Sequence, residues 1–494
     1  MSGRVDDAMI CPVSTQYDKV IEVDSYVREM LGRPKSKEDL KGFLSASSVL
    51  NLKLGRIDVR FHQPWSLRAW IQDQETRLSD FSVSERARLQ QTYNKNLRIR
   101  LLRTLGYRVL SDINAASVVM PTALIGTVLL THRARGLGKS ELIRRVEWLS
   151  ERVRSHGGRV AHFAGLPTAD IVYRGIEVLG PKLVSVRKDD VAEKTYEVVD
   201  AFQMSFYRNM TIHLFVPQAI VCAAMYSCFG NSFAAPQRGM PYEELKSKVL
   251  FLSQLFRAEF IFPMAGLLEN LDSTLTGLET DDIASINRSP ATMTATNTIL
   301  SVSPNSLDHA NIEFFCHLIW PFIETYWLGA VSLLLLTPPA SSTYTATAIP
   351  TSHVSTFLAH AQLLGRTLHA QGLLTYLEAI NKETLSNTLA RLDEDGIVVL
   401  ARKGKGNSAA SVRLGKAWIP GRDGKTGDIV REGKLWDLVE RLGGFRRERN
   451  VMSKEVMRVV DLVAERLWHG MGTRLEGQKQ GRQGGGKTAV KARL

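Results

Sequence analysis

Near its amino terminus the chain reads Ile10-Cys11-Pro12-Val13-Ser14-Thr15-Gln16-Tyr17-Asp18-Lys19-Val20. The short apolar run from residue 9 to residue 14 suits a buried strand, and the alternation of Ile57-Asp58-Val59-Arg60-Phe61 predicts a second strand. Between them, Ser36-Lys37-Glu38-Asp39 is typical of a capping box and predicts a helix that extends to about Leu54. Two strands and one helix cannot bury both of their faces. We therefore expect the remaining strands of this sheet to be supplied from elsewhere or to be missing.

The apolar period becomes helical from about Ser82 and stays so for most of the remaining chain. Ser140 predicts the start of a helix that ends at His156, before two glycines, and it carries an apolar stripe at three- and four-residue spacing. The stripe consists of Leu142, Val146, Leu149 and Val153. Further long helices are expected at residues 84–105, 197–225, 242–260, 311–336 and 355–374.

The longest apolar stretches are residues 115–131, 215–228 and 327–336. Each is broken by proline or is shorter than the ~20 residues that a membrane-spanning helix needs. We interpret them as buried core helices, with contact to a membrane surface as the alternative. The stretches 287–305 and 338–352 are rich in small and polar residues and predict exposed linkers.

The C-terminal part shows a different pattern. A helix at residues 383–393 is followed by Asp395-Gly396, a strand at 397–402, a basic glycine-rich turn and a strand at 410–414. A helix followed by a two-stranded wing indicates the C-terminal half of a winged helix. The tail from residue 471 is basic, contains a Gly-Gly-Gly run and is expected to be disordered.

The composition of the 494 residues favours two to four domains of a soluble, globular class with a large core. Lys and Arg exceed Asp and Glu by 13, so the surface should attract nucleic acid, anionic lipid headgroups or phosphorylated and CoA-type substrates. The four cysteines lack metal-ligand spacing and predict buried thiols in a reducing compartment. No metal site and no secretory signal are predicted.

The stretch at residues 10–20 resembles the fourth and final block of the glycerol-3-phosphate and dihydroxyacetone-phosphate acyltransferases, in which a strand ending in Pro-Val-Ser precedes a Ser-Tyr-Asp-Arg/Lys-like run. Because several further blocks agree in order and spacing, the resemblance covers about residues 8 to 415, and it is closer to the dihydroxyacetone-phosphate branch. Met210 and Cys11 depart from the usual glutamine and branched aliphatic residue, and neither departure bears on chemistry. The further blocks lie at residues 26–35, 55–61, 64–68, 119–133, 207–216, 256–262 and 320–326.

The resemblance implies a mostly α chain with a remnant of an α/β acyltransferase sheet in residues 1–75, a large helical family-specific domain in 76–375, a small winged-helix-like segment in 376–470 and the basic tail in 471–494. It implies transfer of a fatty acyl group from acyl-CoA, as co-substrate, to the sn-1 hydroxyl of dihydroxyacetone phosphate or glycerol 3-phosphate in glycerolipid or ether-lipid synthesis. The partners are then acyl-CoA, a phosphorylated three-carbon acceptor and a membrane surface, without a cofactor.

Acyl transfer needs a base that takes the hydroxyl proton. In this family the base and its partner belong to a His-x-x-x-x-Asp motif, and a Glu-Gly-Thr-Arg-type segment holds the phosphate; both lie upstream of the Pro-Val-Ser strand. None of the eleven histidines here precedes an aspartate by five residues, and Glu-Gly-Thr-Arg does not occur. The resemblance therefore places the catalytic half outside this sequence, as in a truncated gene model, a split gene or an inactive paralogue. It assigns Pro12, Val13 and Ser14 to the acyl pocket, with a core strand as the alternative.

Two further groups invite a catalytic interpretation, namely His132-Arg133 and Tyr207-Arg208-Asn209. We favour helix-end hydrogen bonding and interhelical pairing, since no second acid or base is spaced to assist them. An aromatic cluster between Phe314 and Trp327 suits a core helix better than a lipid headgroup layer.

Two other functions stay open. The chain could be a scaffold that pairs the strand at residues 9–14 with a separately encoded catalytic half. It could also bind nucleic acid through Lys403, Lys405 and Arg413, which the acidic start of the preceding helix disfavours.

The last three residues, Ala492, Arg493 and Leu494, have the small-basic-leucine form of a peroxisomal address. They predict an import receptor as partner and a peroxisomal location, in the matrix or on the membrane. The mitochondrial outer membrane and the endoplasmic reticulum membrane are the alternatives.

Overall fold

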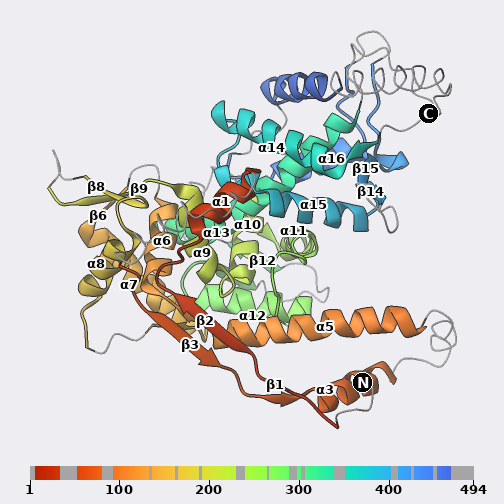
Figure 1. Ribbon diagram of the computed structural model, residues 1–494. Coiled ribbons are helices and arrows are strands. Elements are labelled where there is room, and N and C mark those ends of the chain that lie inside the picture. Colours follow the sequence, from red (N-terminus) through yellow and green to blue (C-terminus); the bar gives the residue numbers. More distant parts are fainter. Residues whose placement is uncertain are drawn as a thin grey trace, which may run out of the picture. The chain divides into compact units, whose positions relative to one another are not determined.

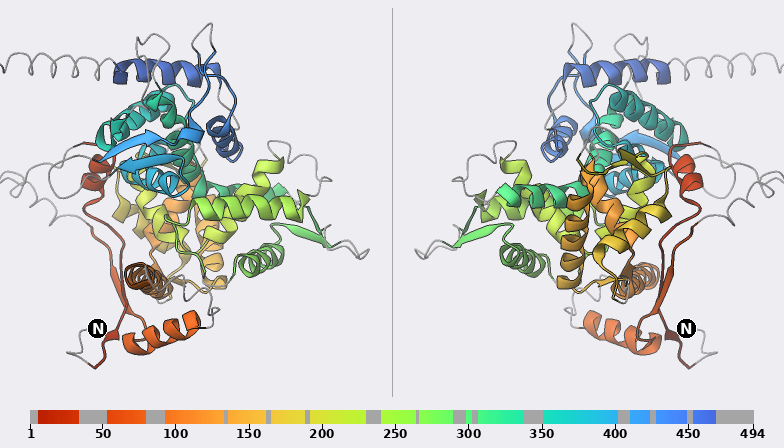
Figure 2. Two further views of the ribbon diagram at one scale, coloured as in Figure 1. Left: turned by 90° about the vertical axis from the view of Figure 1, so that its right-hand side faces the viewer. Right: turned by 90° about the vertical axis from the view of Figure 1, so that its left-hand side faces the viewer.

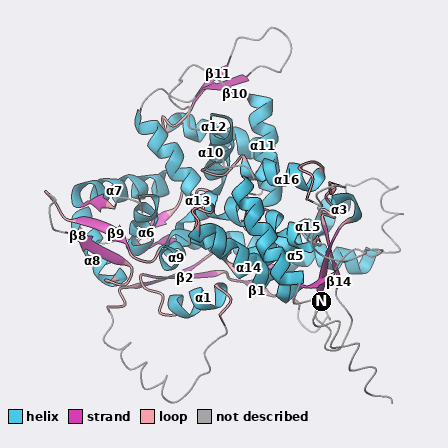
Figure 3. Cartoon of the chain, turned by 90° about the horizontal axis from the view of Figure 1, so that it is seen from above, coloured by secondary structure: helices cyan, strands magenta, loops and turns pink. Residues whose placement is uncertain are grey.

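The computed structural model describes residues 6–33, 53–79, 93–132, 136–161, 165–187, 192–229, 240–263, 266–288, 298–301, 306–337, 351–401, 410–423, 428–448 and 453–468. In these ranges helices dominate and the strands form small sheets, which confirms a mostly α fold (Figure 3). The chain divides into two compact units, each with a buried core. The first comprises Met1–Asp24, Ser36–Val216 and Phe260–Met264, and the second comprises Ser25–Lys35, Pro217–Glu259 and Ala265–Leu494. The domain boundaries expected at residues 75, 375 and 470 stay predictions.

The first unit begins with two short antiparallel pairs (Figure 1). β1 (Met9–Ile10) pairs with β4 (Trp65–Ser66), and β2 (Val13–Tyr17) pairs with β3 (Ile57–Phe61), whose predicted bounds are confirmed. The single buried strand predicted from residue 9 to residue 14 is wrong: it is interrupted at Cys11 and Pro12, and Val13 is exposed. A proline lacks the N–H that a ladder needs, which fits the interruption. Residues 34–52, which include most of the helix predicted after Ser36, lie outside the described residues. Residues 53–56, where that helix is predicted to end, are not helical.

The helical part of the first unit is built around α6 (Pro121–Thr131), whose residues 121–130 are all buried. It packs against α7 (Lys139–Ser155), α8 (Thr168–Leu179) and α9 (Ala201–Ile212). The predicted α7 is confirmed together with its stripe, and Gly157 follows the helix end with a φ of 76°. Short strands complete this part: β5 (Val118–Val119), β6 (Leu137–Gly138), β7 (Arg159–Val160), β8 (Val184–Arg187) and β9 (Thr195–Val198).

Two predicted helices differ from those observed. The helix predicted at residues 84–105 is α5 (Tyr93–Ala116), which extends further, while its predicted start lies outside the described residues. The helix predicted at 197–225 is instead β9, α9 and α10 (Val216–Phe229). Asp200 caps α9 by accepting a hydrogen bond from the Gln203 N–H at 2.9 Å, and Pro217 suits the first turn of α10. The local caps therefore outweigh the continuous apolar pattern.

The second unit is centred on α13 (Ser306–Ser332) and the following η2 (Leu333–Leu336). By length and composition, one helix among the described residues, 310–336, could cross a membrane, or two if the bent pair of α9 and α10 counts as one span; 94 % of the window in 310–336 is buried. This burial supports its interpretation as a core helix. It packs against α14 (Val354–Ala370), η3 (Leu377–Ile380), α15 (Lys382–Glu394) and α16 (Lys434–Gly443). The unit also contains α11 (Tyr242–Leu255), α12 (Leu267–Thr280) and a helix at 454–468.

The predicted helix and wing are confirmed in α15, β14 (Val398–Ala401) and β15 (Ser411–Leu414). The sheet gains a third strand, β13 (Ser352–His353), in the order β13-β15-β14. The linker predicted at residues 287–305 is partly wrong, since β11 (Ser285–Arg288) and β12 (Thr298–Ser301) form a sheet with β10 (Met240–Pro241). The tip of the wing, the linker at 338–350 and the tail from residue 469 lie outside the described residues.

Candidate functional site

The three residues that the resemblance assigns to an acyl pocket lie at the start of β2. Pro12 and Ser14 are buried, while Val13 is exposed, because alternate residues of a strand point to opposite faces. The Ser14 hydroxyl accepts a hydrogen bond from Gln16 Nε2 at 3.3 Å. The structure therefore does not bring the three side chains onto one face, and their role in an acyl pocket stays a prediction.

Asp18 directly follows the strand β2 and is the one acid of the quoted stretch; its side chain is buried. Its Oδ2 accepts a hydrogen bond from the Arg56 N–H at 3.0 Å, and its own N–H donates to the Arg56 carbonyl at 3.0 Å. Burial raises the pKa of this carboxyl above its usual value. Gly55 has a φ of 73°, and a Cβ there would lie 2.4 Å from the Asp18 Cβ. Asp18 thus fixes the end of the β2–β3 ribbon by close backbone approach.

A histidine and a carboxylate approach each other beside this ribbon. The distance from His62 Nε2 to Asp112 Oδ1 is 3.9 Å. However, the Asp112 carboxylate already accepts hydrogen bonds from Arg108 Nε at 3.0 Å and from Trp65 Nε1 at 2.9 Å. A carboxylate neutralised by arginine is poorly suited to support a catalytic base. Asp112 of α5 thus contacts His62, which lies between β3 and β4, and Trp65 of β4. Sequence reasoning missed the pair of His62 and Asp112 because its members are 50 residues apart.

His132 and the Tyr207-Arg208-Asn209 segment hold structural positions, as we favoured. His132 follows the last residue of α6, and its Nδ1 lies 2.8 Å from Thr131 Oγ1. Burial lowers the pKa of His132. Tyr207 and Arg208 are buried, and Arg208 Nη2 donates to Asn209 Oδ1 at 3.0 Å. Arg133 lies outside the described residues.

The second unit contains a buried ion pair between Glu324 and Arg446, with 2.8 Å between Oε1 and Nη2. Glu324 Oε2 also accepts the N–H groups of Thr375 and Tyr376 at 3.0 and 2.8 Å. The guanidinium of Arg446 lies 3.9 Å from the centre of the Trp327 ring. Both charges are therefore used to join α13 to two loops of its unit.

A half-buried acid of this unit, Glu259, is held by neutral donors. Its Oε1 accepts from the Tyr326 hydroxyl at 3.1 Å and its Oε2 accepts from Asn387 Nδ2 at 3.3 Å. Burial raises the pKa of Glu259 to about 7. The aromatic cluster around Tyr326 and Trp327 is buried apart from the partly exposed Phe322, which confirms its interpretation as core.

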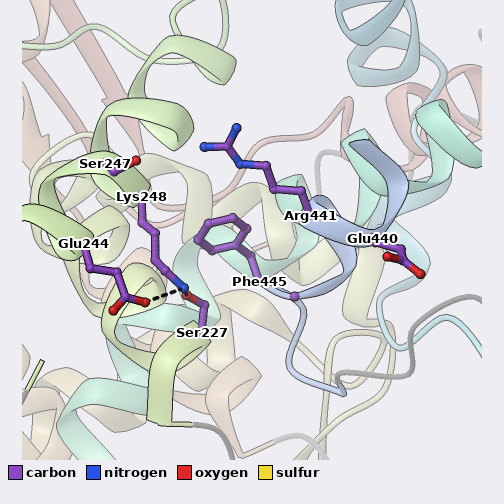
Figure 4. A pocket seen from close by; sticks show the side chains of 8 residues that line it. Ser227, Glu244, Ser247, Lys248, Glu440, Arg441 and Phe445 are labelled. Atoms are coloured by element: carbon purple, nitrogen blue, oxygen red, sulfur yellow. Dashed lines mark hydrogen bonds and ion pairs between the residues drawn. The ribbon is translucent and has the colours of Figure 1, made fainter. Parts of the chain in front are cut away.

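A pocket of about 330 Å³ lies in the second unit (Figure 4). Lys248 Nζ lies 3.5 Å from Glu244 Oε1 and donates to Ser227 Oγ at 3.1 Å. The guanidinium of Arg441 lies 3.8 Å from the centre of the Phe251 ring. Two acids and two bases line the pocket, so its charges offset each other and select no ligand. Its lining comprises Ser227, Glu244, Ser247, Lys248, Glu440, Arg441, Gly444 and Phe445.

The cysteines only partly match the prediction of buried thiols. Cys222 and Cys316 are buried, whereas Cys228 is half-buried and Cys11 is exposed at the interruption between β1 and β2. Within the described ranges, no three His, Cys, Asp or Glu side chains are grouped so that they could hold a metal ion.

The fold is that of a mostly helical chain with two short antiparallel ribbons at its start. Residues 26–401 match the family model described as the glycerol-3-phosphate acyltransferase C-terminal region. Since this match spans well over half of the sequence, the chain belongs to the glycerol-3-phosphate acyltransferase family, as the resemblance implied.

Curated relatives agree with this assignment. The chain is 28 % identical to human dihydroxyacetone phosphate acyltransferase over 343 residues, which are 67 % of this chain and 47 % of that protein. It is 24 % identical to the mouse dihydroxyacetone phosphate acyltransferase over 407 residues, 80 % of this chain and 55 % of that protein. It is 25 % identical to mouse mitochondrial glycerol-3-phosphate acyltransferase 1 over 292 residues, 52 % of this chain and 35 % of that protein. The chain spans about half the length of the curated dihydroxyacetone-phosphate relatives that it matches, and it is closer to that branch.

Proposed function

We propose that this chain acts in an O-acyltransferase of glycerolipid or ether-lipid synthesis, which transfers a fatty acyl group from acyl-CoA to the sn-1 hydroxyl of dihydroxyacetone phosphate or glycerol 3-phosphate. The observation that carries the proposal is the family match over residues 26–401. The relatives' names support the substrate class, and dihydroxyacetone phosphate is the preferred acceptor because that branch matches over more of the chain. The formal net charge of +13 suits the phosphates of both substrates.

We also propose that this chain does not itself supply the catalytic base. A base must present an unprotonated nitrogen to the acceptor hydroxyl, and a partner must fix its tautomer. Among the described histidines, His213 Nε2 lies 2.9 Å from Ser117 Oγ, and burial lowers its pKa to about 4. His317 Nδ1 lies 2.9 Å from the Tyr376 hydroxyl. Each of these two rings is held by a neighbouring hydroxyl, and none of the eleven histidines begins a His-x-x-x-x-Asp motif. We therefore assign the base to a half that carries this motif.

An acyl-transfer assay tests the proposal. Labelled acyl-CoA and dihydroxyacetone phosphate are incubated in three reactions. The first contains the full chain alone. The second contains the half of human dihydroxyacetone phosphate acyltransferase that the chain does not match, and the third contains both polypeptides. We expect no product from the chain alone and product from the mixture. Turnover by the chain alone would show that it contains a base of its own, and a mixture without product would refute the assigned reaction. The control is the variant His62→Ala, tested in the mixture, which should leave product formation unchanged. The carboxylate near His62, that of Asp112, already binds Arg108, so we do not expect His62 to act as a base.

For the nucleic-acid alternative, Lys403 and Lys405 lie outside the described residues, and the described helix α15 argues against it. The helix that would enter a groove, α15, buries Thr388 and Leu389, and Thr388 Cγ2 lies 2.6 Å from the place of a Cβ on Gly329 of α13. Arg391 of α15 donates to the Gln254 carbonyl at 3.0 Å and pairs with Asp395 at 2.8 Å. A helix held this closely within its unit is poorly placed to read bases.

A further inference from the structure

The β2–β3 ribbon has an unusual distribution of side chains between its two faces. In its antiparallel register Val13 lies opposite Phe61, Thr15 opposite Val59 and Tyr17 opposite Ile57. Residues at alternate positions share a face, so these six side chains form one face of the ribbon. We call it the outer face. The opposite face consists of Ser14, Gln16, Asp58 and Arg60.

The outer face is apolar and exposed. Ile57, Val59 and Phe61 are 63, 51 and 72 % exposed, while Ser14 on the opposite face is 2 % exposed. On the opposite face Ser14 is buried, Gln16 and Asp58 are half-buried and Arg60 is exposed. The ribbon therefore leaves its apolar face to solvent, the reverse of a sheet that covers its own core. In Figure 2 the red N-terminal strands run along the margin of their unit, where α5 and β5 contact β2.

The ribbon is fixed in place at both ends. At one end the N–H of His62 donates to the Pro12 carbonyl at 2.8 Å. At the other end Asp18 and Arg56 exchange two hydrogen bonds of 3.0 Å. A platform that is already ordered loses little conformational entropy when a partner binds. An exposed apolar patch with this order is typical of a binding surface.

The neighbouring helix α5 carries a second exposed row at helical spacing. Ile99, Leu102, Tyr107 and Leu110 are exposed, and a Cβ added to Gly106 between them would meet nothing within 4 Å. The last three of these residues follow Ile99 by three, eight and eleven positions, which places all four broadly on one side of the helix. The first unit thus presents an uncovered side on both its ribbon and its longest helix.

We propose that the outer face docks the α/β acyltransferase half of the enzyme, and this inference rests on the proposed function. Three observations select this occupant. β2 and β3 pair only with each other among the described strands, so each leaves an edge to which a further strand can add. The matched family model describes a C-terminal region, and the human relative has about half of its length outside the match. The quoted stretch also resembles the last block of an acyltransferase sheet.

A binding measurement with substitutions on the outer face tests the docking. The probe is the half of human dihydroxyacetone phosphate acyltransferase that the chain does not match, used as a separate polypeptide and also fused to the full chain. We expect the full chain to bind it, and Val59→Lys and Phe61→Glu each to weaken binding at least tenfold. The control is Leu462→Lys, which changes an exposed apolar residue of the helix at 454–468 and should leave binding unchanged. Circular dichroism should show both outer-face variants folded, because the replaced side chains are exposed.

Several results would overturn the docking. One is that the wild type and the outer-face variants bind the probe equally well. Another is that the probe does not bind, either as a separate polypeptide or when fused to the chain. Light scattering that shows a dimer dissociated by Phe61→Glu would assign the face to a second copy, and phosphatidylserine vesicles that bind wild type but not Phe61→Glu would assign it to a membrane. A face-dependent complex without acyl transfer would refute the proposed function alone. Acyl transfer that is unaffected by Phe61→Glu would refute the docking alone.

Discussion

Single residues of this chain show how its buried charges are used. Glu259, Glu324 and Arg446 are all largely enclosed, and each is bound by donors or acceptors of its own unit. Asp18 is also buried, and it fixes the end of the β2–β3 ribbon, where Tyr17 lies opposite Ile57, through Arg56. These enclosed charged side chains therefore hold elements together.

The raised pKa of Glu259 predicts a pH-dependent stability. The folded carboxyl has a pKa of about 7, compared with 4.5 as its ordinary value, so the folded state holds the proton more tightly. The contribution of this group to folding is therefore complete below about pH 4.5 and is lost as the pH rises through 7. At pH 8 the ionised group should cost on the order of 2–3 kcal/mol. Glu259→Gln should raise the thermal midpoint at pH 8 and change it little at pH 5.

The control for this prediction is Glu269→Gln on α12, whose side chain is exposed. It should leave the midpoint unchanged at both pH values. A midpoint of Glu259→Gln that shifts equally at pH 5 and pH 8 would contradict the assigned protonation.

The ion pair between Glu324 and Arg446 predicts a strong coupling at the residue scale. Arg446→Met leaves the buried Glu324 charge without its partner and should cost about 3–5 kcal/mol of unfolding free energy. The double variant with Glu324→Gln and Arg446→Met lacks both charges. It should lose less unfolding free energy than the variant with Arg446→Met alone. Urea unfolding of the two single variants and the double variant measures this coupling, and additive losses would show that the pair does not interact.

At the scale of elements, two helices approach each other closely where one of them carries a glycine. Gly329 of α13 lies against α15, where an added Cβ would lie 2.6 Å from Thr388 Cγ2. Thr388 is itself buried and donates to the Thr384 carbonyl at 2.9 Å, so it has little room to move. In contrast, Gly106 of α5 faces open space.

These two helical glycines should respond to alanine with opposite signs. Gly106→Ala should stabilise the chain by about 0.5–1 kcal/mol, because alanine loses less backbone entropy in a helix. Gly329→Ala should destabilise it by about 1–3 kcal/mol, because the added methyl group overpacks the contact between α13 and α15. Thermal unfolding of both variants provides the comparison, and a stabilising Gly329→Ala would disprove the close packing.

At the scale of the whole molecule, the chain consists of two units and a tail that ends in Ala492-Arg493-Leu494. These three residues lie outside the described residues, so the targeting role is argued from sequence alone. We propose that an import receptor binds them and that the enzyme acts at the peroxisome, on the membrane or in the matrix.

A fluorescent protein fused in front of the full chain tests the targeting. We expect punctate fluorescence that coincides with a peroxisomal marker, and diffuse or differently localised fluorescence when Leu494 is deleted. Replacement of Arg493 by lysine is the matched control and should preserve the localisation, since it retains the basic position of the signal. Peroxisomal fluorescence that survives deletion of Leu494 would assign targeting to another segment.

The sequence predicted those parts of the fold that depend on local pattern. The alternation from Ile57 to Phe61 gave β3, the stripe of α7 was correct residue by residue, and the helix and wing lie within a few residues of their predicted bounds. The predicted continuous helix from 197 to 225 failed, because the Asp200 cap and Pro217 divide it. The family was also identified correctly, since residues 26–401 match its C-terminal region.

The sequence by itself determined the family, the mostly α class and the absence of a His-x-x-x-x-Asp motif, because these depend on residue types and on their spacing along one chain. Only the tertiary structure decided which face of the β2–β3 ribbon is covered. Alternation separates Val13 and Val59 from Ser14 and Asp58, but it does not say which set meets the core. That choice depends on contacts with distant segments, and here they cover Ser14 and leave Phe61 to solvent.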